Sequence, residues 1–263
     1  MISVIMSAYN AEKYISEAIE SILNQSFKDF EFIIINDCSK DNSLEIIKGY
    51  AKEDNRIRLV NNKENLGLTK SLNKGIKLAE GKYIARMDAD DIAEKDRFKE
   101  QVEFLEENND IDILGALAKD IDEEGNLLGE RTVPVTNNEI INILPKLSPM
   151  IHPAVMFRKK SLERINFYNE NYRTSQDYEM WFRAKAAGLK FYNLPKCLLR
   201  YRVNNNYFER KSFKYRLNDI KVRYKGYLNI KLPIHKWYPL CIPLILGVIP
   251  AWMYKLLKKA DPR

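Results

Sequence analysis

Three carboxylates in the stretch Arg86-Met87-Asp88-Ala89-Asp90-Asp91 follow directly after the apolar run Tyr83-Ile84-Ala85. Aspartates spaced two residues apart beside a loop can share a hard cation through their oxygens, leaving positions for water and for the phosphates of a nucleotide. These residue types therefore predict a Mg²⁺ or Mn²⁺ site that bridges to a diphosphate. Three acids after a strand are also common as a solvated loop or a helix N-terminal cluster, so the prediction depends on the surrounding elements.

Those elements alternate. An apolar run that ends in a turn and charges is typical of a buried strand, and residues 3–6, 30–35 and 57–60 are further runs of this kind. Helical patterns over residues 12–23, 43–50 and 69–79 separate them, with Asn10 as the expected N-cap of the first. The alternation predicts an α/β fold with a mostly parallel sheet. Right-handed crossovers then bring Ser7, Asp37 and Asp88 to one edge of that sheet, where ligands bind.

Both glycine-rich phosphate loops are missing from this arrangement. No G-x-G-x-x-G follows the first strand, and no G-x-x-x-x-G-K-[ST] occurs in the chain. A metal held by the carboxylates is the predicted substitute.

Composition limits the class of protein. With 263 residues and 45% hydrophobic content, the chain can bury a full core. Three widely spaced cysteines suggest neither a disulfide framework nor a thiolate metal site, so a reducing compartment is expected. The first residues run directly into strand-like sequence, and no signal peptide is expected.

The net charge of +7 is unevenly distributed. Residues 200–263 carry fifteen Lys and Arg against three Asp and Glu, which leaves a net of −5 for the rest. Such asymmetry predicts an anionic partner surface, either lipid headgroups or nucleic acid. Residues 207–230 read as a basic, aromatic-rich helix, either on a membrane surface or packed and solvated. Residues 237–254 are uncharged, contain three prolines and are flanked by lysines, which favours a segment lying in the membrane interface over a spanning one.

Several spaced motifs together carry a family resemblance. They are Ser-Val-Ile-Met-Ser-Ala-Tyr-Asn from residue 3, Ile-Ile-Ile-Asn-Asp-Cys-Ser-Lys-Asp from residue 33, Asn-Leu-Gly-Leu from residue 65, residues 81–91, and Asp96-Arg97-Phe98. Their sequence and spacing resemble the family 2 glycosyltransferases over most of residues 1–203. The resemblance implies a GT-A fold, with a nucleotide-binding half (residues 1–98) and an acceptor-binding half (99–203). The charge and apolar patterns described above predict an appended membrane-associating segment over residues 204–263.

The resemblance also implies roles for single residues. Ser7, Tyr9 and Asp37 would hold the uridine, Arg86 and Asp88 the rest of the nucleotide, and Asp90 the divalent metal. The chemistry fits, since a tyrosine ring can stack on a base and an ionised carboxylate can accept the N–H of uracil. The simpler alternatives are that Tyr9 covers the edge of the core and Asp37 caps the helix near residue 42.

Two positions depart from the family pattern. Asn36 stands where a first aspartate is common, and Cys38 stands where glycine is common. Both lie beside Asp37, so the departures concern the geometry of this loop.

The second informative stretch runs from Tyr172 to Arg183. Thr174 or Ser175 is expected to begin a helix with Tyr178, Trp181 and Phe182 on its apolar side. Asp177, in its first turn, matches the family's general base, with Gln176 where an acid is more usual. The alternative is an interaction with the helix dipole worth only ~0.3 to 1 kcal/mol.

Three weaker predictions concern the acceptor half. Trp181 is expected to contact the acceptor, and His152 is expected either to line the acceptor pocket or to bond the loop backbone. A hairpin is expected to turn at Gly125-Asn126. The arginines of the run 198–203 are further candidates for the diphosphate.

These observations predict an inverting glycosyltransferase at the cytoplasmic face of the membrane. It would move a sugar from a nucleotide diphosphate, UDP above all, to a saccharide or lipid-linked saccharide acceptor in cell-surface polysaccharide synthesis. Nucleic acid is not expected as a partner. Two alternatives stay open: a basic membrane- or nucleic-acid-binding scaffold with a vestigial nucleotide pocket, and a nucleotidyltransferase, which would need the glycine loop that residues 7–10 lack.

Overall fold

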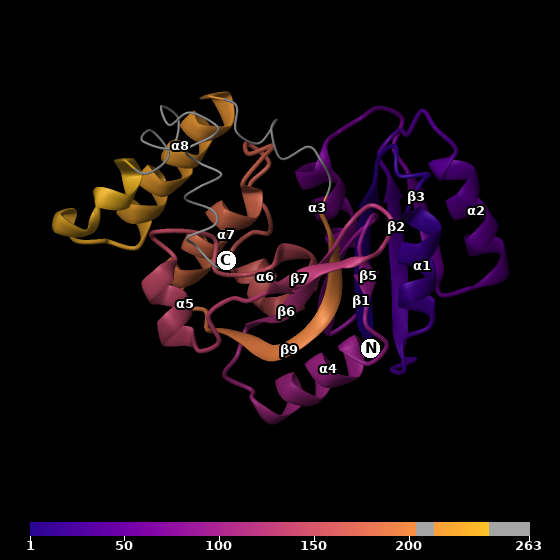
Figure 1. Cartoon of the computed structure of the whole chain (residues 1–263), viewed down its shortest axis with the longest axis horizontal. Helices are drawn as coiled ribbons and strands as arrows, with labels where there is room; N and C mark the ends of the chain where they lie inside the picture. Colours follow the sequence, from indigo (N-terminus) through magenta and orange to yellow (C-terminus); the bar gives the residue numbers. More distant parts are fainter. Residues whose placement is uncertain (204–212, 242–263) are drawn as a thin grey trace.

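A single mixed sheet runs through the computed structural model, which describes residues 1–203 and 213–241 (Figure 1). Its nine strands lie in the order β3-β2-β1-β4-β8-β6-β9-β5, with β7 paired to β6. The sheet crosses from the predicted nucleotide half into the predicted acceptor half without a break.

The first half contains the predicted alternation of strands and helices. Its parallel strands are β1 (Ile2–Ala8), β2 (Phe30–Asn36), β3 (Ile57–Asn61) and β4 (Tyr83–Asp88). Helices α1 (Ile15–Leu23), α2 (Ser43–Glu53) and α3 (Leu68–Leu78) connect them. Strands β1, β2 and β4 are almost wholly buried, as expected for parallel strands covered on both faces, while β3 at the edge of the sheet is partly exposed.

Asn10 does not cap the first helix, which corrects one prediction. Helix α1 begins at Ile15, after Tyr14. Asn10 adopts a φ of 50° in the turn after β1, and its side-chain oxygen accepts from the N–H of Lys40 at 2.9 Å. The side chain thus joins the loops that follow β1 and β2.

The second half adds antiparallel strands to the sheet. In chain order it contains β5 (Ile92–Ala93), α4 (Arg97–Glu107), β6 (Ile113–Ile121), β7 (Leu127–Arg131), α5 (Asn137–Ile143), the 3₁₀ turn η1 (His152–Ala154), β8 (Met156–Arg158), α6 (Lys159–Arg164), α7 (Gln176–Ala186) and β9 (Phe191–Arg202). Strands β6 and β7 form the expected hairpin, with Gly125 at a φ of 88° in its turn. Strand β9 runs parallel to β6 and then pairs with β5 at Leu199 and Arg200.

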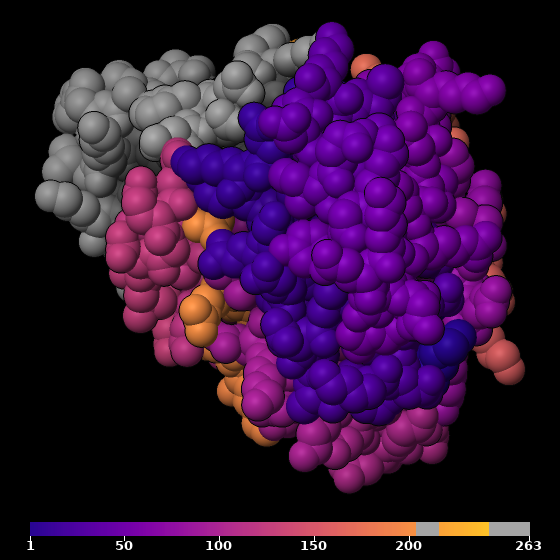
Figure 2. All heavy atoms as spheres, turned by 90° about the vertical axis from the view of Figure 1, so that its right-hand side faces the viewer, coloured from indigo at the N-terminus to yellow at the C-terminus, as the bar shows by residue number. Residues whose placement is uncertain are grey.

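Two apolar layers cover the faces of the sheet. Successive residues of β1 alternate between them, with Val4 and Met6 in the layer beneath α1 and Ile5 in the layer beneath α3 and α7. Figure 2 shows that the first third of the chain, in indigo and purple, forms most of the surface on its side of the molecule.

Helix α8 (Phe213–Asn229) packs against α7 and is followed by the 3₁₀ turns η4 (Ile234–Lys236) and η5 (Tyr238–Cys241). Gly226 allows the close approach, since a Cβ there would come within 2.4 Å of the ring of Phe182. Arg223 donates to the carbonyls of Pro145 and Lys146. Within residues 1–203 and 213–241, no helix is both long enough and apolar enough to cross a bilayer. Most of the apolar segment predicted over residues 237–254, and residues 207–212 of the predicted basic helix, lie outside the described part.

Candidate active site

The carboxyl ends of β1, β2 and β4 lie side by side at one edge of the sheet. Ser7 of β1 is in register with Ile35 of β2 and with Asp88 of β4. Asp37 follows β2, and its N–H donates to the carbonyl of Ala8 at 2.8 Å. The predicted placement of Ser7, Asp37 and Asp88 at one edge is therefore confirmed.

Asp37 is buried, and its carboxylate organises the loop that leads into α3. One oxygen accepts from the amide of Asn62 at 2.8 Å and from the N–H of Leu66 at 2.9 Å, and the other accepts from the N–H of Gly67 at 2.8 Å. The first N–H of α2 donates instead to Asp41, so the alternative that Asp37 caps that helix is wrong. Asp37 thus fixes the walls of the edge at which a base is expected.

Tyr9 lies in the turn after β1 and is 46% exposed, so the alternative in which it covers the core is wrong. Ser7 beside it is half-buried. Cys38 has a φ of 61°, in the left-handed region that glycine enters without steric cost. This conformation accounts for the glycine that is common at its position, and the chain retains it with a cysteine.

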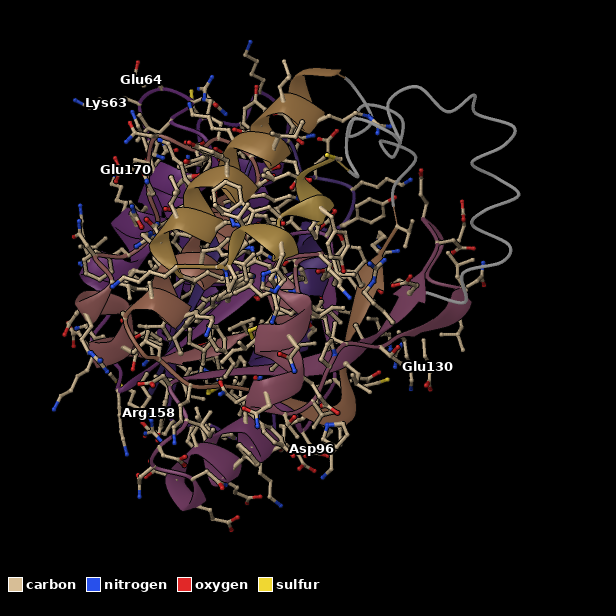
Figure 3. All side chains as sticks on the ribbon, turned by 90° about the vertical axis from the view of Figure 1, so that its left-hand side faces the viewer. Lys63, Glu64, Asp96, Glu130, Arg158 and Glu170 are labelled. Atoms are coloured by element: carbon tan, nitrogen blue, oxygen red, sulfur yellow. The ribbon has the colours of Figure 1, made fainter. Side chains whose placement is uncertain are left out.

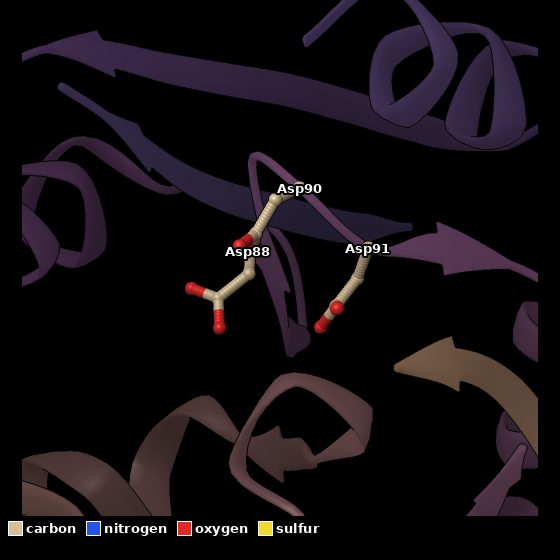
Figure 4. A group of neighbouring side chains, drawn as sticks. All are labelled: Asp88, Asp90 and Asp91. Carbon is tan, nitrogen blue, oxygen red and sulfur yellow. The ribbon is translucent and has the colours of Figure 1, made fainter. Parts of the chain in front are cut away.

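The three aspartates at and just after the end of β4 gather at the same edge, as Figure 4 shows. Carboxylate oxygens of Asp88, Asp90 and Asp91 all lie within 4.8 Å of one another. Asp88 and Asp90 are half-buried, while Asp91 is buried. Hard oxygen ligands in this number and proximity suit Mg²⁺ or Mn²⁺.

Asp91 provides a test of whether a cation fits this cluster. Burial and the charges of Asp88 and Asp90 raise the pKa of Asp91 well above its ordinary value. One of its oxygens accepts from the N–H of Arg202 at 2.8 Å, and the other has no hydrogen-bond partner among the described residues. Since like charges crowd here and a buried oxygen lacks a partner, a divalent cation would satisfy both, and the residues fit such an ion.

Arg202, the last residue of β9, holds the aspartate loop from the C-terminal side. Its guanidinium donates to the carbonyl of Asp90 at 2.9 Å and to the carboxylate of Glu17 at 2.5 Å. Arg200 pairs with Glu94 at 3.0 Å. The guanidinium of Arg202 is engaged within the protein, which contradicts its predicted contact with the diphosphate. Arg200 is exposed, and its contact with the diphosphate stays a prediction.

Arg86 is buried at the end of β4 and forms an ion pair with Asp88. Its Nε and Nη1 have no hydrogen-bond partner in the part of the chain that the structure describes. A buried guanidinium with two unused N–H-bearing nitrogens is costly unless a ligand supplies acceptors. This geometry is compatible with the predicted contact between Arg86 and the nucleotide.

Asp177 lies in the first turn of α7, in the second half of the chain. Burial raises the pKa of its carboxyl group, the N–H of Tyr178 and the charge of Arg86 lower it, and Asp88 raises it. Arg86 also lowers the pKa of His152, after burial, and acts on Tyr168. Arg86 and Asp88 of β4 thus act electrostatically on Asp177, and the role of Asp177 as the base stays a prediction.

Two predicted acceptor residues lie deeper than expected. Trp181 is fully buried, stacks on Phe157 and donates its indole N–H to the hydroxyl of Ser148 at 3.2 Å. This burial contradicts direct contact between Trp181 and the acceptor, because the indole ring packs inside the core. His152 is 8% exposed, and its Nε2 lies 2.6 Å from the hydroxyl of Tyr168 rather than on loop backbone. Its contact with an acceptor stays a prediction.

Side chains of α3 hold the segment before α7 by hydrogen bonds that the sequence did not predict. The side chain of Asn73 on α3 bonds both the carbonyl and the N–H of Tyr168, at 2.9 and 3.0 Å. Thr69, also on α3, donates to the carbonyl of Tyr172 at 2.6 Å. Because partners 95 and 103 residues apart show no local pattern, no sequence signal identifies them.

The chain is similar to known glycosyltransferases over most of its length. An uncharacterized glycosyltransferase of Methanocaldococcus jannaschii is 38% identical, over 98% of this chain and 92% of its own. The O-antigen biosynthesis glycosyltransferase WbnJ of Escherichia coli is 33% identical, over 82% of this chain and 84% of its own. The crystal structure of Staphylococcus aureus TarS 1–349 in complex with UDP is 25% identical with a TM-score of 0.70, over 92% of this chain and 70% of that one.

This structural likeness, together with the mixed sheet, confirms the predicted GT-A type of fold. The family model described as Glycosyl transferase family 2 matches residues 3–166. More than half of the sequence is thus matched, and the enzyme class follows from the family. The chain is a member of glycosyl transferase family 2.

Proposed function

We propose that the protein is a metal-dependent, inverting glycosyltransferase that moves a sugar from a UDP-sugar to a hydroxyl group of a saccharide acceptor. The proposal rests on the Asp88, Asp90 and Asp91 cluster together with Asp177, whose helix α7 follows the segment that Thr69 of α3 binds at Tyr172. A carboxylate cluster alone would suit many cation sites, whereas a further half-buried carboxylate on α7 adds a candidate base for transfer to a hydroxyl.

The donor is proposed to lie along the edge formed by β1, β2 and β4. Uracil stacks on Tyr9, with Ser7 and Asp37 at the uridine, and Arg86 and Asp88 at the remainder of the nucleotide. The bound UDP of the related TarS structure supports uridine as the nucleoside.

The reaction proposed is a direct displacement at the anomeric carbon. Asp177 accepts the proton of the acceptor hydroxyl while that oxygen forms the new bond to carbon, and the bond from carbon to the diphosphate oxygen breaks. Attack opposite to the leaving group inverts the anomeric configuration. Asp90, with Asp88 and Asp91, would hold Mn²⁺ or Mg²⁺, which would supply positive charge to stabilise the departing UDP.

Calorimetry of UDP binding tests the donor site. We expect binding with Mn²⁺, loss of binding with EDTA, and loss in Asp90→Ala. The matched control is Asp96→Ala, which removes an exposed aspartate that makes no side-chain cap to α4 (Figure 3). UDP binding that is unchanged by EDTA and by Asp90→Ala would contradict the metal site. Absence of UDP binding under every condition would contradict UDP as the donor nucleotide.

A lipid-linked saccharide at the cytoplasmic face of the membrane is the proposed acceptor. The basic C-terminal region and the O-antigen relative support an acceptor used in cell-surface polysaccharide synthesis. Incubation with labelled UDP-sugars and bacterial membrane lipids should move label into the organic phase. Label that enters only water-soluble saccharides would contradict the lipid linkage.

A further inference from the structure

Exposed apolar side chains are concentrated on α8 and the turns that follow it. Five of the nine large hydrophobic residues that are exposed in the described part lie between residues 213 and 241. They are Leu217, Tyr224, Leu228, Ile234 and Tyr238, with exposed fractions between 49% and 82%. Figure 3 views the molecule from this side and shows α8 and its following turns at the surface.

The exposed residues of α8 form one stripe. Leu217, Lys221, Tyr224 and Leu228 are spaced by four, three and four positions, which places them on one side of a helix. The opposite side carries the buried residues Val222, Arg223, Gly226 and Tyr227 and packs on the protein. Helix α8 therefore presents apolar residues both to the protein and, on its opposite side, to the solvent.

Trp237 fixes the following turns to this helix. Its ring meets those of Tyr224 and Tyr227 edge to face, with centroids 5.7 and 5.8 Å apart. Its indole N–H donates to the carbonyl of Leu232 at 2.9 Å. Trp237 thus packs the turns that contain Ile234 and Tyr238 against α8.

The surface between these apolar residues is basic. Lys221, Lys225, Lys231 and Lys236 are exposed, and no described acidic residue pairs with them. Asp219 is the one acid between residues 213 and 241, and it pairs with the buried Arg223 at 3.1 Å. We use the term α8 face for these four lysines and the five exposed apolar residues.

We propose that the α8 face docks on an anionic lipid bilayer. Tyrosine and aliphatic side chains on one side of a helix, interleaved with lysines, suit the headgroup region, where the rings enter the interface and the ammonium groups meet phosphates. The uncharged run that continues from Cys241 to Tyr254 points to the same partner. The inference rests on the proposed function, because it gives a lipid-linked acceptor a surface from which to reach the site.

Vesicle partitioning of the full chain tests the charge of this face. We expect tighter binding to phosphatidylglycerol-containing vesicles than to pure phosphatidylcholine vesicles. Changing Lys221, Lys225, Lys231 and Lys236 to Glu should reduce that preference at least about a hundredfold, given about fivefold per lysine. The matched control changes four exposed lysines outside residues 213–241 to Glu: Lys28, Lys52, Lys77 and Lys99. An equal loss in both variants would overturn the α8 face as the docking surface.

A fluorescent reporter tests which side approaches the lipid. An environment-sensitive dye on Ile234→Cys, with Cys38, Cys197 and Cys241 changed to Ser, should shift to the blue with anionic vesicles. The same dye on Leu127→Cys, at a site 65% exposed on β7, should not shift. A shift at both sites or at neither would overturn the proposal, as would a shift caused by dimerisation in the absence of vesicles.

UDP binding, measured on the same samples, separates the two proposals. Docking without UDP binding would contradict the donor site alone. UDP binding without lysine-dependent docking would contradict the α8 face alone.

Discussion

The side-chain amide of Asn218 donates to both the carbonyl and the hydroxyl oxygen of Thr174, each at 2.9 Å. Thr174 precedes Ser175, whose left-handed φ of 56° turns the chain into α7, and Asp177 follows in the first turn of that helix. Helix α8 belongs to the region predicted as a separate appendage. It nevertheless bonds the residues that lead into α7 and so helps to position Asp177.

Removal of this support should lower the turnover number. We expect Asn218→Ala to reduce kcat about 10- to 100-fold, because a small displacement of a catalytic group is costly, while the KM for the donor stays unchanged. Steady-state kinetics measure both. Asn229→Ala, an exposed position at the end of the same helix, is the control and should leave kcat unchanged. A parallel rise in donor KM would indicate a general structural loss instead.

Asp177→Asn should reduce kcat by about 10²- to 10⁴-fold, the usual contribution of a positioned base, and leave UDP binding intact. The wild-type rate should also depend on pH. Because burial raises the pKa of Asp177 above the ordinary aspartate value, the ionised base is lost as the pH falls through that raised pKa, and kcat/KM falls with it. The residual rate of Asp177→Asn should lack this acid limb. An identical acid limb in the variant would assign the titration to another group.

His152 should make the protein less stable at mildly acidic pH. Burial, and then the charge of Arg86, keep its pKa well below 6.5 in the folded state. Below about pH 6.5 the histidine of the unfolded chain binds a proton that the buried His152 does not, so the free energy of unfolding falls as the pH falls. At pH 5.5 the expected loss relative to neutral pH is about 1.4 kcal/mol from this group.

Urea unfolding at pH 7.5 and 5.5 measures the effect. His152→Gln should lose less stability between the two pH values than the wild type does, by about that amount. His235→Gln, which replaces the exposed histidine of η4, should behave like the wild type. Equal losses in wild type and His152→Gln would contradict the prediction.

The contact between α7 and α8 should not tolerate a methyl group. Gly226→Ala would place its Cβ within 2.4 Å of the Phe182 ring, and we expect a destabilisation of about 1–3 kcal/mol. Gly49→Ala is the matched control, since Gly49 lies inside α2 with no atom within 4 Å of an added Cβ. Alanine there should stabilise by about 0.5–1 kcal/mol. A stable Gly226→Ala protein would mean that α8 can shift away from Phe182.

Local sequence patterns predicted the first half well for a physical reason. Parallel strands buried on both faces need continuous apolar runs, and those at Ile33 and Tyr83 are unmistakable. The polar residues at their ends then follow from topology. The placement of Ser7, Asp37 and Asp88 could be predicted in this way without any knowledge of side-chain contacts.

The errors have a common origin in long-range packing. Trp181 and Arg202 have side chains that could serve a ligand, and their helical or strand position is readable from the sequence. Their partners are not, because Ser148 and Glu17 lie 33 and 185 residues away in the chain. The same limit hid the bonds between α3 and Tyr168, which no periodicity encodes.

Strand β9 makes the predicted metal site depend on sequence that lies far beyond the aspartates themselves. Its end at Arg202 supplies the N–H bound by Asp91 and the guanidinium bound by the carbonyl of Asp90. A chain that ended at α6 would carry every aspartate of the cluster and would lack the strand that holds their loop. The loop that carries the aspartate cluster is therefore held in place by a residue 111 positions further along the chain, and any truncation before β9 removes that hold.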